Sequence, residues 1–411
     1  MRSAEEPRET ASGHRLPLGT ASAFASGNDR PVSADRTDVL IVGGGPVGLD
    51  LACRLVLAGL SVRVLEKRLE PTRHSRSIGI HPPALEVLAG IGVVDSLIAE
   101  GIQVASGLAH AGSKPIGRLA FERCPPPYRF VLAIEQWKTE RILEARLREL
   151  APGALRRGVE VTTLAQHEDG VSVETGDCTR YEADWLVGCD GKNSRVRDLI
   201  KLPFVGRAYD DPYIMGDFAD NSGIGPRAAI FLTSGGLVES FPLPDAWRRW
   251  VVRTPLAIPG VDPAPDLVTA LVIERTGFRP DPTTARMTSS FGVERRLAAT
   301  MAHGRVLLAG DAAHVVSPIG GQGMNLGWLD AADAAPALVG AHQRECDAPA
   351  LFRAYSNRRR LAADRAADRA EFNMWFGISS AIPALKFLAA RLMLSPPLAG
   401  VFARRFTMRG I

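Results

Sequence analysis

The stretch Asp38-Val-Leu-Ile-Val-Gly43-Gly-Gly-Pro-Val-Gly48 decides the fold that we expect for this chain. After Asp38, residues 39–42 form an unbroken apolar run rich in β-branched side chains, which is typical of a buried strand. The glycines follow at once, and the spacing of Val47, Leu51 and Leu55 is typical of a helix. The order of strand, glycine turn and helix predicts the opening unit of a dinucleotide-binding fold.

Each glycine of this G-x-G-x-x-G pattern has a physical reason. Gly43 permits a tight turn, Gly45 lets the backbone approach a pyrophosphate, and Gly48 allows the helix to pack closely on the strand. A helix that begins at Pro46 would present its positive end to the phosphates. The pattern therefore predicts a phosphate site at the start of the first helix.

A second expected strand, residues 61–65, extends the pattern. It ends at Glu66, 18 residues after Gly48, where a carboxylate would accept hydrogen bonds from a ribose. Strand, helix, second strand and acidic residue follow in the expected order, which a lone glycine pattern does not offer. These residues leave NAD and FAD as the two candidate ligands.

Two later segments favour FAD. Trp185-Leu-Val-Gly-Cys-Asp-Gly191 is an apolar run that ends in Asp-Gly, and Arg305-Val-Leu-Leu-Ala309 runs into Gly310-Asp311. Either dipeptide alone is typical of an ordinary turn. Both, however, follow expected buried strands, and α/β sheets bind their ligands at the edge where such strands end. The segment from Pro318 to Asn325, rich in glycine, continues the second motif.

With these three motifs the chain resembles the flavin-dependent monooxygenases of the para-hydroxybenzoate hydroxylase type, the single-component (class A) aromatic hydroxylases. The resemblance covers roughly residues 36–360, and three motifs in this order are specific to the family, though not to a substrate. It implies an α/β fold. A Rossmann-like FAD-binding domain of the glutathione-reductase type would be interleaved with an antiparallel-sheet substrate domain, and a helical C-terminus would follow.

The resemblance implies a role for residues in each motif. Asp311 would bind the ribitol of FAD, while Asp190 and Arg195 would take part in handling FAD and NAD(P)H. Arg76 resembles the family arginine that contacts the FAD phosphates, and Gln136 resembles a glutamine near the ribityl chain. The full set of expected cofactor-binding residues is Gly43, Gly45, Pro46, Val47, Gly48, Glu66, Lys67, Arg76, Gln136, Asp190, Arg195, Gly310, Asp311, Pro318, Gly321, Gly323, Met324 and Asn325.

The expected catalytic centre is a flavin-facing loop rather than an acid or a base. Pro318, Gly320 and Gly321 form it, because small residues let the backbone lie against the flavin and aim N–H groups at developing negative charge. His81 and Tyr213 lie in segments that, by resemblance, approach the active site, so either is a candidate for deprotonating a phenol. No motif supports them.

The implied activity is that of an FAD-dependent NAD(P)H monooxygenase. Because the chain has a single nucleotide fingerprint, NADPH or NADH would bind only transiently to reduce FAD. O2 would then supply the oxygen atom that hydroxylates or epoxidises an aromatic or apolar small molecule, in natural-product or aromatic metabolism. His314 fits best as a hydrogen-bonded structural residue. No metal and no protein nucleophile are expected, since neither pattern occurs.

Three other functions stay open. Trp247-Arg-Arg-Trp250 bears a superficial likeness to the tryptophan motif of a flavin halogenase, but W-x-W-x-I-P is absent. A flavin-dependent prenyl reductase, which saturates double bonds, would differ by consuming no oxygen. A prenyl-binding escort protein on a decayed flavin fold would be colourless when purified.

The pattern of runs and turns also predicts the domain organisation. Residues 158–181 read as a meander, runs such as 228–232 and 249–253 as strands of a substrate sheet, and residues 361–376 as a packing helix. Pro336 puts the length of the helix after Asp330 in doubt. We expect a disordered leader at 1–35, an FAD domain at 36–105, 130–200 and 289–340, a substrate domain at 106–129 and 201–288, and C-terminal helices at 341–411.

Composition excludes several classes. Apolar residues make up 46% and charged residues 23%, as in globular proteins, and a net charge of +4 without a basic block argues against nucleic acid. Five cysteines without a C-x-x-C pair indicate a reducing, cytoplasmic setting. No transmembrane segment is expected. Five basic and no acidic residues after position 380 leave peripheral membrane contact open beside a docked helix pair, and both a monomer and a homodimer fit.

Overall fold

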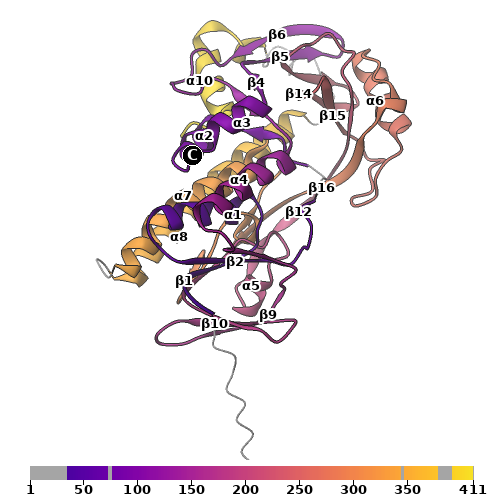
Figure 1. Ribbon diagram of the computed structural model, residues 1–411. Coiled ribbons are helices and arrows are strands. Elements are labelled where there is room, and N and C mark those ends of the chain that lie inside the picture. Colours follow the sequence, from indigo (N-terminus) through magenta and orange to yellow (C-terminus); the bar gives the residue numbers. More distant parts are fainter. Residues whose placement is uncertain (1–34, 73–75, 344–346, 378–390, 411) are drawn as a thin grey trace, which may run out of the picture. The chain divides into compact units, whose positions relative to one another are not determined.

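The computed structural model describes residues 35–72, 76–343, 347–377 and 391–410. The expected leader lies outside these residues, apart from Asp35. Three sheets organise the described chain, and helices α1, α4 and α7 lie side by side above strands β1 and β2 (Figure 1). The helices are α1 (Pro46–Leu57), α2 (Pro82–Ala89), α3 (Val94–Glu100), α4 (Gln136–Leu150), α5 (Arg195–Leu199), α6 (Pro265–Thr276), α7 (Gln322–His342), α8 (Ala348–Gly377) and α10 (Pro396–Phe406).

The first sheet has eight strands, and its centre is parallel in the order β18-β11-β1-β2-β8. The antiparallel strands β9 and β10 extend it beside β11 as the expected meander. Its strands are β1 (Asp35–Val42), β2 (Val62–Glu66), β8 (Leu155–Arg157), β9 (Val161–Gln166), β10 (Val171–Thr175), β11 (Arg180–Gly188), β17 (Ala302–His303) and β18 (Val306–Leu308).

The second sheet also has eight strands, in the order β19-β16-β12-β15-β14-β13-β5-β6, and all its neighbours are antiparallel except β13 and β5. Helix α6 packs against β12 to β15. A small third sheet joins β3 (Gly79–Ile80), β7 (Val131–Ala133) and β4 (Ile102–Val104). The strands of the second sheet are β5 (Ser106–Ala111), β6 (Lys114–Ala120), β12 (Phe204–Ala219), β13 (Ala228–Thr233), β14 (Gly236–Leu243), β15 (Trp247–Arg253), β16 (Met287–Ala298) and β19 (His314–Val315).

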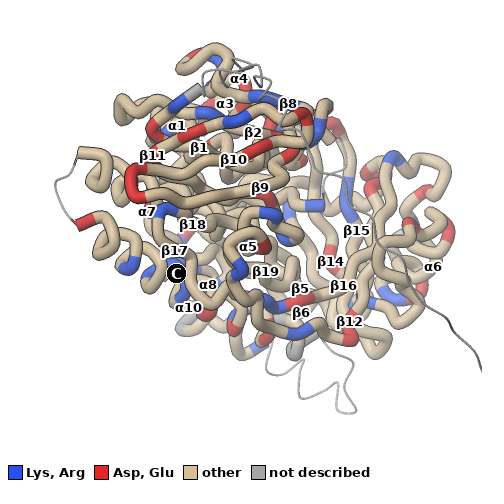
Figure 2. Tube along the Cα trace, turned by 90° about the horizontal axis from the view of Figure 1, so that it is seen from below, with Lys and Arg blue, Asp and Glu red and all other residues tan. Residues whose placement is uncertain are grey.

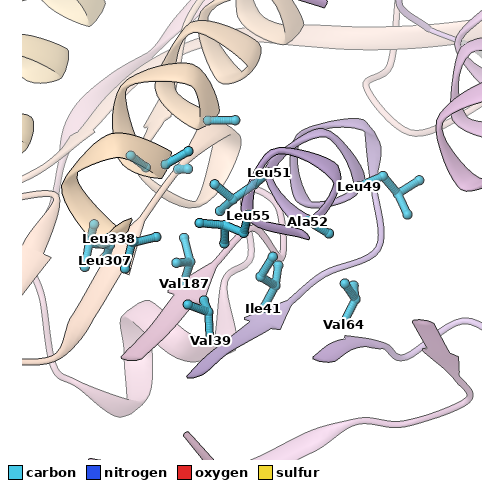
Figure 3. Packing of buried hydrophobic residues seen from close by; sticks show 14 of the residues in the cluster. Val39, Ile41, Leu49, Leu51, Ala52, Leu55, Val64, Val187, Leu307 and Leu338 are labelled. Atoms are coloured by element: carbon cyan, nitrogen blue, oxygen red, sulfur yellow. The ribbon is translucent and has the colours of Figure 1, made fainter. Parts of the chain in front are cut away.

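The main core lies where α1 packs between the first sheet and helix α7. Val39 and Ile41 of β1, Leu51 of α1, Leu307 of β18 and Leu338 of α7 are fully buried in one cluster (Figure 3). Burying side chains of this size stabilises the fold by roughly 1.5–3 kcal/mol each. The 3.6-residue spacing along α1 therefore fixes the glycine turn above the ends of the parallel strands.

The expected mixed α/β fold with an antiparallel sheet and a helical C-terminal part is confirmed. The division into two domains stays a prediction, and its boundary at residue 289 falls inside β16. Helix α7 continues through Pro336 to His342, although proline removes one backbone donor. Alanines 334, 335 and 337 are buried around Pro336, so packing outweighs the local propensity.

Charge and hydropathy add two observations on the described residues. Basic and acidic residues are interspersed along the chain rather than gathered by sign (Figure 2), as the small net charge suggests. Among these residues, no helix has the length and apolar character that crossing a membrane requires. The membrane contact considered for the C-terminus stays a prediction, and part of that segment, residues 378–390, lies outside the described residues.

Substitutions at two glycines of the first turn can distinguish a role in packing from a role in ligand binding. A Cβ at Gly48 would lie 2.0 Å from the carbonyl oxygen of Gly43, whereas a Cβ at Gly45 would meet no atom within 4 Å. We expect Gly48→Ala to lower the free energy of unfolding by about 1–3 kcal/mol through overpacking. Gly45→Ala should lower it by less than about 1 kcal/mol, as a weaker N-cap. Urea unfolding of the cofactor-free protein measures both, and equal losses would contradict this assignment.

Candidate functional site

A cavity of about 710 Å³ opens at the carboxyl ends of β1, β2, β11 and β18. The second sheet contributes its other wall. This edge of a parallel sheet is where α/β folds bind nucleotides. The expected cofactor or loop residues that line it are Gly43, Gly45, Pro46, Val47, Glu66, Lys67, Arg76, Gln136, Asp190, Arg195, Asp311, Pro318, Gly320, Gly321, Gly323 and Met324.

Three expected residues lie behind the wall instead. Gly48 packs on the Gly43 turn, Gly310 packs on Val47, and Asn325 is fully buried. Their contribution is to position the lining rather than to meet a ligand. The structure thus brings the three sequence motifs together around one space, and the binding roles of the individual residues stay predictions.

The start of α1 has the properties of a phosphate site. Gly45 has φ −79° and ψ −176°, a conformation open to any residue, so the fold itself does not require glycine there. No side chain caps the helix, and its first turn has no acidic residue. The positive end of the helix therefore faces free space, into which a side chain at position 45 would project. A ligand phosphate explains both the glycine and the uncapped helix.

Glu66 holds the glycine turn against β2. Its Oε2 accepts a hydrogen bond from the Gly44 amide at 2.8 Å, and its Oε1 accepts two from Arg68, each at 2.9 Å. Burial raises the pKa of this carboxyl, but the bonds from Arg68 and Gly44 outweigh burial and leave the pKa below its usual range. Glu66 is therefore ionised. A carboxylate has about four acceptor sites, so one stays free for a ribose hydroxyl.

Two further carboxylates at the cavity have at least one oxygen without a hydrogen-bond donor among the described residues. Asp311 is enclosed by protein but exposed to the space of the cavity, and no described group donates a hydrogen bond to it. Asp190 accepts a bond from the Val196 amide at 3.1 Å, while its Oδ1 is buried without a partner. Burial raises the pKa of both groups. Sugar or ribitol hydroxyls would supply the missing donors.

The Gly310-Asp311 turn depends on a residue that sequence reasoning missed. Asp330, fully buried on α7, accepts a hydrogen bond from the Gly310 amide at 2.9 Å and contacts His314 Nε2 at 2.6 Å with the same oxygen. Its other oxygen accepts a bond from Arg359 of α8 at 2.7 Å. Burial raises the pKa of Asp330, but His314 and Arg359 outweigh it, so the pKa lies below its usual range. His314 thus has the structural place expected for it.

Asn325 fixes the conformation of the loop that is expected to face the flavin. Its side-chain amide donates to the carbonyls of Gly79 and Gly321 at 2.9 and 2.7 Å, and its oxygen accepts from the His81 amide at 2.7 Å. Gly320 and Gly321 have φ of 87° and 66°, which favours glycine. The loop therefore presents backbone to the cavity in a fixed conformation.

The two candidate bases have other roles. Burial lowers the pKa of His81 to about 4, so its ring is neutral and Nε2 donates to the Gly320 carbonyl at 3.0 Å. Tyr213 is buried, its hydroxyl donates to Asp211 at 3.3 Å, and burial and Asp211 raise its pKa. His81 lines the cavity and Tyr213 does not. Neither is poised to accept a proton at neutral pH.

The wall from the second sheet is mostly apolar. Its lining includes Met215, Phe241, Val251 and Phe291, and Phe406 of α10 adds a ring on the side of His81. Such a surface fits an aromatic or apolar molecule. No sequence motif points to these residues, because they come from four strands and a helix that are far apart along the chain.

Two charged residues also lie on this wall. Arg249 donates to both oxygens of buried Asp217, at 2.7 and 2.8 Å, and to the carbonyl of Arg76 at 2.7 Å. It thereby ties β15 to the segment that carries the expected phosphate-binding arginine. Glu239 of β14 is 6% exposed.

The described residues hold one group with metal-like spacing, and it lies away from the cavity. Asp38, Asp184 and His342 bring ligand atoms within 4.8 Å of one another. Asp38 already accepts bonds from Ser61, and Asp184 from Arg36. We assign no metal there.

The Asp330 contacts can be tested against a matched neighbour. Asp333 is on the same helix and pairs with Arg358 of α8, but at the surface. We expect Asp330→Asn to cost about 3–5 kcal/mol in unfolding free energy, because it leaves Arg359 without its buried charge partner. Asp333→Asn should cost at most about 1 kcal/mol. Thermal or urea unfolding measures the stability of both variants. Similar losses of unfolding free energy would show that the buried contacts of Asp330 contribute no more than the surface pair of Asp333.

Asp330 also predicts a pH dependence. A carboxyl with a lowered pKa contributes stability above its unfolded pKa, and that stability is lost as pH falls through the folded value. The stability gap between wild type and Asp330→Asn should therefore narrow in acid. A gap that is constant down to the acid limit of folding would argue against an ionised Asp330.

Comparison with known proteins agrees with this geometry. A family model described as FAD binding domain matches residues 36–370. The 6-methylpretetramide 4-monooxygenase of Streptomyces rimosus is 36% identical over 335 residues, 77% of this chain, and the dialkyldecalin synthase of Streptomyces rugosporus is 35% identical over 80% of it. The chain covers 58% and 70% of these two proteins, and about three fifths of several other curated relatives.

A solved structure shows the same fold over nearly the whole described chain. The p-nitrophenol 4-monooxygenase PnpA from Pseudomonas putida DLL-E4 has a TM-score of 0.83 and 23% sequence identity, covering 91% of this chain and 99% of its own. The resemblance that the three motifs indicated is therefore confirmed. The chain belongs to the FAD binding domain family, and its relatives include flavin-dependent monooxygenases of the aromatic hydroxylase type.

Proposed function

We propose that this protein is an FAD-dependent monooxygenase that uses NADPH or NADH and O2 to hydroxylate an aromatic small molecule. The observation that carries the proposal is a single cavity with two unlike halves. One half has the glycine turn, the ionised Glu66, and Asp190 and Asp311, whose carboxyl groups have oxygens without a donor; the other half has an apolar wall with aromatic rings. A redox cofactor and an apolar substrate would lie against each other there.

The residues present fit FAD. The uncapped start of α1 and the open space at Gly45 suit a pyrophosphate, Glu66 suits a ribose, and Asp311 suits the ribitol hydroxyls. When bound, FAD would supply the oxygen-activating redox chemistry that amino-acid side chains lack. The chain's own residues bind it, orient the substrate and exclude water.

The loop at Pro318, Gly320 and Gly321 contributes orientation and electrostatics. Its conformation is fixed by Asn325 and His81, and it leads into the N-terminus of α7, whose dipole is positive at that end. N–H groups held in this way stabilise developing negative charge without reorganising. No acid or base is required at the loop, and His81 stays neutral because of its low pKa.

The proposal is tested on the purified protein. Flavin absorption bands, with NADPH or NADH oxidation and oxygen uptake that a phenol or quinol stimulates, are the expected result. Bound flavin without oxygen uptake would contradict monooxygenation and favour a double-bond reductase. No bound flavin, even after incubation with FAD, would favour a binding protein.

Gly45→Val tests the phosphate site separately from the fold. The new side chain would project into open cavity space, so the cofactor-free protein should unfold within a few degrees of wild type. FAD affinity should fall by at least a hundredfold, because the side chain would occupy the space of the pyrophosphate. Fluorescence titration with FAD measures the affinity, and wild-type affinity would refute the phosphate-loop assignment.

Asp311→Ala tests the ribitol assignment. Removing a charged hydrogen-bond acceptor should weaken FAD binding by roughly tenfold to a hundredfold. Asp198→Ala, at an exposed position outside the cavity lining, serves as the control and should bind FAD as wild type does. Full retention of flavin by Asp311→Ala would show that the Gly-Asp motif was misassigned.

A further inference from the structure

Glu239 is an acidic residue on the cavity wall formed by the second sheet, and no described group explains its presence there. It is 6% exposed, lines the cavity, and has no hydrogen-bond partner or ion-pair partner among the described residues. Other buried acidic residues of the same sheet are paired, since Asp217 binds Arg249 and Asp211 binds Arg253. Burying a carboxyl group without hydrogen-bond partners in an apolar wall costs free energy. We therefore expect a ligand to supply the missing partner.

The sheet fixes the direction in which Glu239 points. In β14, Glu239 pairs with Val251 of β15 and Ile230 of β13, and Phe241 follows two residues later on the same face. Val251 and Phe241 also line the cavity. The carboxyl is therefore held on the apolar face of the second sheet, away from α6.

The charged and titratable groups around this face are already engaged. Arg249 on β15 is held by Asp217 of β12, and Tyr213 of β12 donates to Asp211. The nearby strands β4 and β7 bring apolar lining, Val104 and Val131. Burial alone raises the pKa of Glu239 to about 7. The group thus changes its charge within the pH range in which an enzyme works.

We propose that Glu239 is the specificity-determining residue of this site and accepts a hydrogen bond from a hydroxyl group on the aromatic ring of the substrate. This inference rests on the proposed function for the nature of the substrate. It defines the substrate class as phenols whose hydroxyl points to the second sheet, with the rest of the ring against Phe241 and Phe291. A hydroxyl would supply the donor that Glu239 lacks, and a hydrogen bond to a carboxylate makes the ring more electron-rich.

The test compares two aromatic compounds, of which one has a hydroxyl group that can donate a hydrogen bond and the other has a methoxy group that cannot. Isothermal titration of the FAD-incubated protein at pH 8, where Glu239 is ionised, measures the affinity for 1-naphthol and for its methyl ether, 1-methoxynaphthalene. We expect wild type to prefer 1-naphthol at least tenfold. The preference should shrink at pH 6, because protonation removes the charged acceptor.

Variants assign the preference to the residue. Glu239→Gln and Glu239→Leu should lose most of the preference for 1-naphthol while binding the ether at least as well as wild type. Glu274→Gln, exposed on α6, is the matched control and should keep it. If the Glu239→Leu variant does not fold, the Glu239→Gln variant alone decides the test, because glutamine keeps the shape of the side chain.

The outcomes separate this inference from the proposed function. A wild-type protein without preference for the hydroxyl, or a Glu239→Gln variant that keeps the preference, would overturn the role of Glu239 even if FAD reduction and oxygen uptake proceed. Conversely, a Glu239-dependent preference in a protein that consumes no oxygen would support the recognition site while overturning monooxygenation.

Discussion

The buried carboxylate of Asp330 is the interaction on which the cofactor half of the cavity depends. It joins the amide of Gly310, the ring of His314 and the guanidinium of Arg359, and so links the end of β18 to α7 and α8. Gly310 has φ of 62°, a backbone conformation that needs such support. Asp311, the next residue, can then point into the cavity without a protein partner. An ionised group without exposure is costly to bury, and full pairing is what makes it tolerable.

The substrate half depends on a second buried pair. Arg249 and Asp217 bridge neighbouring strands of the second sheet, and Arg249 also binds the carbonyl of Arg76. The apolar wall and the segment that approaches the expected phosphate site are thereby held in one arrangement. Helix α10 adds Phe406, which stacks on Phe121 and meets His81 edge-on. The C-terminal helix is thus part of the cavity wall.

Local sequence patterns predicted the fold and the motifs that meet at the cavity, because their physical causes are short-range. The binding roles of the individual residues stay predictions. The glycine turn, Glu66 at the end of β2 and Gly310-Asp311 after β18 each follow from spacing within one strand–turn unit. Asp330, Arg249 and Glu239 could not be predicted, since their partners or neighbours come from other strands and helices. The length of α7 could not be predicted across Pro336, because helix propensity takes no account of the buried alanines around this proline. His81 drew attention as a base, but only burial reveals that its pKa is too low.

The central claim is that cofactor and substrate occupy one cavity. The most direct measurement is a difference spectrum of the FAD-loaded protein during titration with 1-naphthol. If the ring lies against the flavin, its binding will perturb the visible flavin bands, with the same dissociation constant that calorimetry gives. Saturable binding of 1-naphthol that leaves the flavin spectrum unchanged would show that the two sites are separate, and would contradict the account.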